Sequence, residues 1–154
     1  MKHKTRWALL GLLGLCAVHT VGADDFTSRD ARNTITVTVK ERNQVLFEMR
    51  ELLHGLYNLN LALSKNDFQG VSTAAKSMSP LMQKVPDSMK ARLPEPFMQL
   101  ALAQRESFEI LARNAEAKKD HALIVGQIAE SVTYCSGCHD TYRFEVNKYL
   151  SATY

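Results

Sequence analysis

The chain has 154 residues, 45% of them hydrophobic and 23% charged, which is the length and composition of one globular domain. Its 19 basic and 16 acidic residues give a formal net charge of only +3, so nothing in the balance points to a nucleic-acid partner. The sequence contains no repeat, no glycine-rich phosphate loop and no paired-carboxylate or Ser/His/Asp arrangement, and we therefore expect that the protein is not an enzyme.

Residues 1–23 have the features of a cleaved signal peptide. A basic start precedes an apolar run over residues 7–18, which is too short to span a bilayer. Residues 21–23 then supply small side chains for cleavage before Asp24. Cleavage leaves residues 24–154 as a single mature domain with 16 basic and 16 acidic side chains and no membrane span. We therefore expect export to the periplasm.

The first predicted element begins near Thr38. Polar and apolar residues alternate from Thr34 to Val39, which is typical of a strand, but no nearby segment offers a partner strand. Thr38 and Glu41 match a capping box, which starts a helix instead. Apolar residues then recur at spacings of three, four and seven, so we expect a helix over residues 39–64.

Three further helices are expected, over residues 68–79, 95–118 and 121–147. Asp67 and Asp120 are good N-caps for the first and last of these, and prolines suit the first turn of the middle one. One longer connection separates the second helix from the third, and the other turns are short. Four amphipathic helices joined in this way predict an all-α fold, an antiparallel four-helix bundle.

Near the C-terminus the chain carries Cys135-Ser136-Gly137-Cys138-His139, the Cys-x-x-Cys-His pattern of c-type haem attachment. Two thiols at this spacing lie on one helical turn and can add to the two vinyl groups along one porphyrin edge. His139 can then ligate the iron as a proximal histidine, so we expect one covalent haem c. The alternative is a protein without haem, in which Cys135 and Cys138 form a redox or structural pair.

A helical bundle with this motif on its last helix is similar to the cytochrome c prime family, the class II c-type cytochromes. The resemblance is most specific over residues 135–143, where Tyr142 and Arg143 follow the histidine in the family's order. It covers the mature chain only at the level of helix order. It implies a haem between the first and last helices, with His139 on one face and the first helix on the other. Family members also often pair through their first two helices, which implies a homodimer.

The resemblance leaves two residues for the other face of the iron, because the short turn after the first helix allows two registers. If Arg42 matches a family arginine near the haem propionates, Leu46 lies over the iron and the site stays open. If the register is counted back from the end of the helix, Met49 lies there, as in the family's low-spin branch. We favour Met49 as the sixth ligand. Arg42 and Arg50 flank this position and are candidate partners for the propionates, because a guanidinium matches a carboxylate in a bidentate way.

Each register predicts a different function. Ligation by His139 and Met49 closes the iron to other ligands and raises its potential, which suits a carrier of single electrons between periplasmic redox partner proteins. Leu46 over the iron leaves an apolar pocket that suits a five-coordinate protein binding or buffering nitric oxide or carbon monoxide. We expect the electron carrier and keep the gas-binding protein as the alternative.

Overall fold

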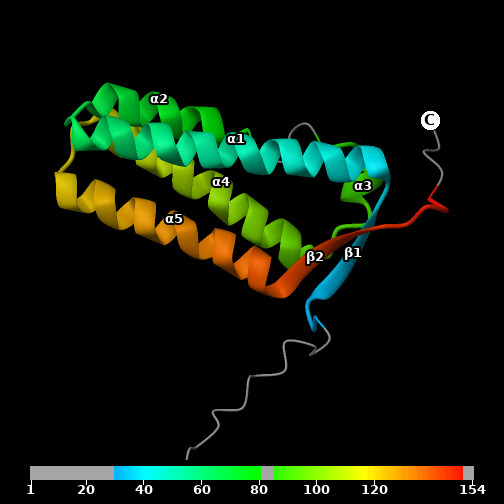
Figure 1. Ribbon diagram of the computed structural model, residues 1–154. Helices are drawn as coiled ribbons and strands as arrows, with labels where there is room; N and C mark the ends of the chain where they lie inside the picture. Colours follow the sequence, from blue (N-terminus) through cyan, green and yellow to red (C-terminus); the bar gives the residue numbers. More distant parts are fainter. Residues whose placement is uncertain (1–29, 81–84, 151–154) are drawn as a thin grey trace, which may run out of the picture. The chain divides into compact units, whose positions relative to one another are not determined.

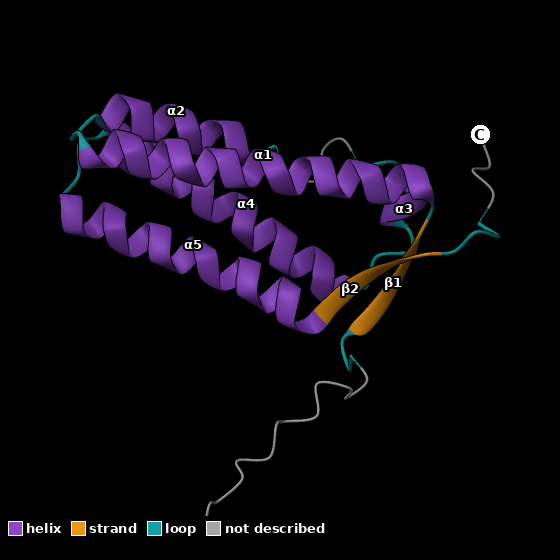
Figure 2. Cartoon of the chain, viewed as in Figure 1, coloured by secondary structure: helices purple, strands orange, loops and turns teal. Residues whose placement is uncertain are grey.

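The computed structural model describes residues 30–80 and 85–150, and the elements below belong to one compact unit, Ala31–Tyr154. In chain order they are β1 (Asn33–Val37), α1 (Val39–Ser64), α2 (Phe68–Met78), α3 (Asp87–Lys90), α4 (Glu95–Glu116), α5 (His121–Thr141) and β2 (Tyr142–Val146). The described residues are therefore mostly helical, with a small sheet of two strands (Figure 1 and Figure 2). Within this part of the chain, no helix combines the length and apolarity needed to cross a membrane. The predicted signal peptide lies outside the described residues.

The predicted helix starts are confirmed, and so are the caps that set them. α1 begins and ends at the predicted residues. Its capping box is complete, because the Thr38 hydroxyl accepts a bond from the N–H of Glu41 at 3.2 Å and the Thr38 N–H donates to Glu41 Oε2 at 2.7 Å. Asp67 and Asp120 cap α2 and α5, since their carboxylates accept bonds from backbone N–H groups of the first turn. α4 begins at its proline-bearing turn, as expected.

The last helix is shorter than predicted and is followed by a strand. α5 ends at Thr141, so the helix predicted over residues 121–147 was wrong for its C-terminal part. Tyr142 is buried and Phe144 and Val146 are half-buried, at every second position, which is the side-chain period of a strand.

The alternating pattern at residues 34–39 indicated a strand correctly, and the objection that it lacks a partner was wrong. The segment contains β1, which pairs in parallel with β2, from Asn33 opposite Tyr142 through to Val37 opposite Val146. The partner strand lies about 100 residues later in the sequence, where no local pattern reveals the pairing. The all-α prediction therefore holds for the helices and fails for these two segments.

The helices pack in chain order, α1 on α2, α2 on α4 and α4 on α5, whereas α1 and α5 make little contact with each other (Figure 1). Two apolar clusters form the core. The first joins the four long helices through buried residues that include Leu59, Val71, Phe108, Leu111 and Ile124. The second joins the sheet to the segment before α4, and its buried members are Ile35, Val37, Val85, Met89, Leu93 and Tyr142. Each large side chain so buried contributes about 1.5–3 kcal/mol to folding.

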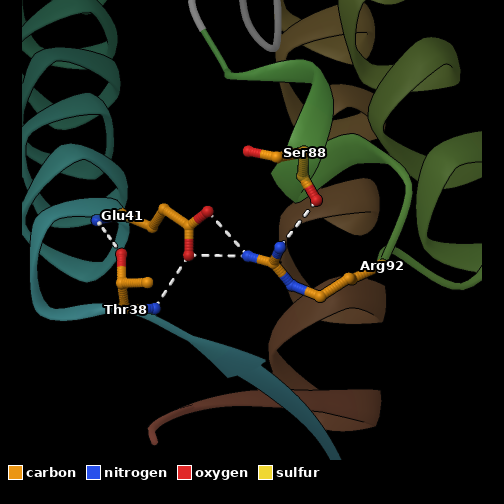
Figure 3. Close-up of polar contacts among 4 residues, drawn as sticks. All are labelled: Thr38, Glu41, Ser88 and Arg92. Atoms are coloured by element: carbon orange, nitrogen blue, oxygen red, sulfur yellow. Dashed lines mark hydrogen bonds and ion pairs between the residues drawn. The ribbon is translucent and has the colours of Figure 1, made fainter. Parts of the chain in front are cut away.

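An ion pair between exposed Arg92 and buried Glu41 joins the start of α1 to the segment around α3 (Figure 3). Arg92 Nη2 donates to both carboxylate oxygens of Glu41, at 2.6 and 2.7 Å, and Nη1 donates to the backbone oxygen of Ser88 at 2.7 Å. Glu41 is only 8% exposed. Burial alone would raise the pKa of its carboxyl, but the hydrogen bonds from Thr38 and Arg92 outweigh burial and hold that pKa below its ordinary value.

Candidate functional site

The Cys-x-x-Cys-His motif lies in the last two turns of α5. Cys135 and Cys138 are half-buried free thiols, and His139 is exposed. Residues three and four positions apart lie on one face of a helix, so α5 gathers the two thiols and the imidazole on one side. This is the arrangement that the helical setting of the motif predicted.

Sequence reasoning missed Gln104 of α4, which contacts the motif directly. Its side chain is buried, 6% exposed, and its Nε2 donates to the Sγ of Cys135 at 3.0 Å. The same sulfur donates to the backbone oxygen of Ser131 at 3.7 Å. Gln104 stands between Ala101 and Phe108 on the buried side of α4, and a lone glutamine on that apolar stripe was the available signal.

Both thiols are less acidic than ordinary cysteines. Burial raises the pKa of Cys135 and outweighs the bond from Gln104, and burial also raises the pKa of Cys138, with a further contribution from the neighbouring Cys135. Reactive redox cysteines have lowered pKa values, often at helix N-termini. The pair formed by Cys135 and Cys138 instead lies near the C-terminus of α5, and burial raises the pKa of both thiols.

The apolar core is interrupted at the level of the motif on α4 and α5. Ile128 of α5 belongs to the first cluster and Tyr142, the first residue of β2, belongs to the second, with the two cysteines between them in the sequence. On α4, Phe108 belongs to the first cluster and Leu100 packs on the second, with Gln104 between them. The side chains that separate the two clusters are therefore the ones around the motif.

The interruption continues on α1, at the position of the predicted sixth ligand. Val45 packs on the second cluster and Leu52 on the first. Met49 stands between these two residues, is half-buried and belongs to neither cluster formed by the described residues. Met49 on α1, Gln104 on α4 and the cysteines on α5 thus all fall between the same two clusters.

The predicted distal residues share one side of α1. Gly55 marks the side that meets α2, because Met78 of α2 lies against it. Leu46, Met49 and Leu53 are spaced by three and four, and lie roughly 120° or more around the helix from Gly55. Leu46 is 39% exposed and Leu53 is 66% exposed. Leu46 and Leu53 of α1 are therefore only partly covered by the rest of the protein.

His139 lies on the opposite side of α5 from a groove that this helix forms with α4. Gln127, Glu130 and Tyr134 line a shallow groove with α4 and so mark the side of α5 beside that helix. Val132 and His139, seven positions apart, lie roughly 120° or more around α5 from that groove. Val132 is 41% exposed. α1 packs on α2 and α5 packs on α4, whereas α1 and α5 make little contact with each other.

The structure does not bring the predicted residues of α1 against the motif, because α1 and α5 make little contact. Arg42 and Arg50, the predicted propionate partners, are exposed on α1. Among the residues that the structure describes, no group of three or more His, Cys, Asp or Glu side chains is arranged to hold a metal ion. A haem needs no such group, since its iron takes one or two axial ligands from the protein.

No family model, curated protein or solved structure matches this chain.

Proposed function

We propose that the protein is a periplasmic monohaem c-type cytochrome built as a four-helix bundle similar to the cytochrome c prime family. Cys135 and Cys138 would hold the haem through thioether bonds, and His139 would ligate its iron. The observation that carries the proposal is the setting of the motif. It lies where the apolar core is interrupted, on a helix that does not pack against the helix bearing Met49.

The residues around the motif fit a haem. A porphyrin is a broad apolar group, and Leu46, Leu53 and Val132 are apolar side chains that the protein alone leaves 39%, 66% and 41% exposed. Burying such side chains against a porphyrin is favourable, at about 25 cal/mol per Å² of apolar surface. The raised pKa values of both thiols differ from the lowered values typical of reactive redox cysteines.

We propose Met49 as the sixth ligand and electron transfer as the role. A long, flexible apolar side chain usually fills gaps in a core. Met49 instead stands outside both apolar clusters and is half-buried. The bound haem would supply one-electron redox chemistry. The chain's own part is to attach it, to hold His139 and Met49 on its two faces, and to exclude water with Leu46 and Leu53.

Leu46 supports the second candidate function. It lies one turn before Met49 on the same side of α1 and is 39% exposed. If Leu46 faced the iron, an apolar side chain would leave one axial position open for nitric oxide or carbon monoxide. The two proposed functions therefore depend on which of two α1 side chains, Met49 or Leu46, lies over the iron, and these residues are one helical turn apart.

One optical spectrum of the exported protein separates the three possibilities. A low-spin spectrum with the weak sulfur-to-iron band of methionine ligation is the result that we expect. A high-spin spectrum that shifts on addition of carbon monoxide would replace electron carriage by gas binding. If acid–acetone removed all haem, or none were present, haem attachment at Cys135 and Cys138 would be wrong and the cysteine pair would remain.

A further inference from the structure

Arg32 forms a hydrogen bond with the residue that we propose as the proximal iron ligand. Its Nη1 donates to the backbone carbonyl oxygen of His139 at 3.1 Å. Arg32 directly precedes β1, and His139 lies near the end of α5. The contact therefore joins the segment before β1 to the end of α5, which are 107 residues apart in the sequence.

The carbonyl group of His139 needs a partner from outside its helix. The last four carbonyl groups of a helix have no hydrogen-bond partner within it. In α5, the carbonyl of Cys138 accepts from the backbone N–H of Tyr142, and that of His139 accepts from Arg32. A cation near a helix C-terminus also interacts favourably with the helix dipole. Arg32 thus caps α5 from a segment remote in the chain.

The sheet holds Arg32 beside this helix end. Asn33 pairs with Tyr142, the first residue after α5. Val37 of β1 is completely buried. Tyr142 packs edge-on against Phe97 of α4, with ring centroids 5.4 Å apart. Because β1 cannot shift without losing these buried contacts, the register of the sheet sets the position of Arg32.

We propose that Arg32 is a positioning residue for His139. Together with β1 it holds the C-terminal turn of α5, and this turn sets the orientation of the imidazole that ligates the iron. The role rests on the proposed haem-binding function and adds to it a residue far from the motif in sequence. In this proposal the parallel strand pair also has a structural role, since β1 supports the end of α5 that carries His139.

The test uses two substitutions of Arg32 and one matched control. Arg32→Gln removes the charge, whereas Arg32→Lys keeps a charge and a donor. Arg113→Gln is the control, because Arg113 also lies in the last turn of a long helix, α4. Two measurements are made on the exported full chain. They are hydrogen exchange of the backbone amides of residues 138–146, and the hyperfine-shifted haem methyl resonances of the ferric protein, whose pattern reports the orientation of the axial imidazole.

We expect Arg32→Gln to speed the exchange of these amides about fivefold, as the loss of one ordinary hydrogen bond would do. It should also change the haem methyl pattern. Arg32→Lys should restore most of both, and Arg113→Gln should leave both unchanged. Either an unchanged methyl pattern in Arg32→Gln or an effect shared by Arg113→Gln would overturn the role of Arg32. A wild-type chain without covalent haem would overturn the proposed function itself, and this role with it.

Discussion

At the scale of single residues, Met49 and Leu46 decide what a haem on this chain can do. Both lie on α1, one turn apart, and neither is fully buried. A thioether over the iron favours electron transfer, and a leucine leaves a place for a small gas. The choice between the two proposed functions is therefore a choice between two neighbouring side chains.

Replacing Met49 by alanine should leave the sixth coordination position of the proposed haem iron vacant. We expect Met49→Ala to convert the ferric protein from low spin to high spin and to lower its reduction potential, because the sixth ligand that raises the potential is lost. Absorption and electron paramagnetic resonance spectra measure the first effect, and a redox titration measures the second.

Leu53→Ala is the matched control for this substitution, since Leu53 lies one turn further along the same side of α1. It removes apolar surface from that side but no sulfur, so the iron should stay low-spin. A spectrum that Met49→Ala leaves unchanged, or one that both substitutions alter equally, would contradict ligation by Met49.

The helical setting of the proposed attachment residues was predictable from the sequence, because the chemistry proposed for them fixes their spacing. Two cysteines and a histidine at i, i+3 and i+4 make one helical face in any helix, and α5 is a helix at those positions. Gln104 was not predictable from spacing, because its contact with Cys135 depends on how α4 and α5 pack. Arg32 was missed for the same reason, since its bond to His139 depends on the strand pairing.

At the scale of elements, the start of α1 is held by the contact between Glu41 and Arg92 (Figure 3). This contact positions the helix that carries Met49. Replacing Arg92 by alanine should lower the free energy of unfolding at pH 7 by about 2 kcal/mol, because it leaves the largely buried Glu41 carboxylate without its cation. Urea unfolding followed by circular dichroism measures the loss.

The cost of Arg92→Ala should depend on pH. The folded pKa of Glu41 is below its ordinary value of 4.5, so the contribution of Glu41 to stability is complete above pH 4.5 and is lost as the pH falls through the folded pKa. The variant should therefore differ from wild type less in strong acid than at pH 7. Lys90→Ala, which breaks the exposed pair with Asp87, is the control. It should leave the free energy of unfolding unchanged both at pH 7 and in strong acid. An equal loss from Arg92→Ala at both pH values would refute the explanation.

The strand pair should contribute to the stability of the whole domain. Val37 in β1 is completely buried, whereas Val39, two residues later, is 61% exposed. Val37→Ala should cost about 2 kcal/mol of unfolding free energy because it removes buried methyl groups and leaves a cavity. Val39→Ala should change it by less than about 0.5 kcal/mol. Chemical denaturation of the two variants makes the comparison, and equal values would mean that β1 does not belong to the folded core.

The sequence predicted the elements whose signals are local and missed those whose signals are not. Caps at Thr38, Asp67 and Asp120 fixed where three helices begin, because each cap acts within its own first turn. The two strands pair with each other, but they lie about 100 residues apart in the sequence. Tyr142, Phe144 and Val146 were therefore assigned to the helix that precedes them.

At the scale of the whole molecule, the four long helices do not pack equally. α1 and α5 make little contact with each other, and each carries exposed apolar residues. The core is also split into two clusters at the level of the motif. A covalent haem between α1 and α5 would account for all three features together.

The most direct test of this account is the mass of one peptide. Trypsin cleaves after Lys119 and Arg143, so a single peptide, residues 120–143, contains the whole motif. In the protein exported with its own leader by a host that attaches haem c, this peptide should carry the added mass of one haem, and Cys135→Ser with Cys138→Ser should abolish it. An unmodified peptide from the wild-type chain, with both thiols free or joined to each other, would contradict the account.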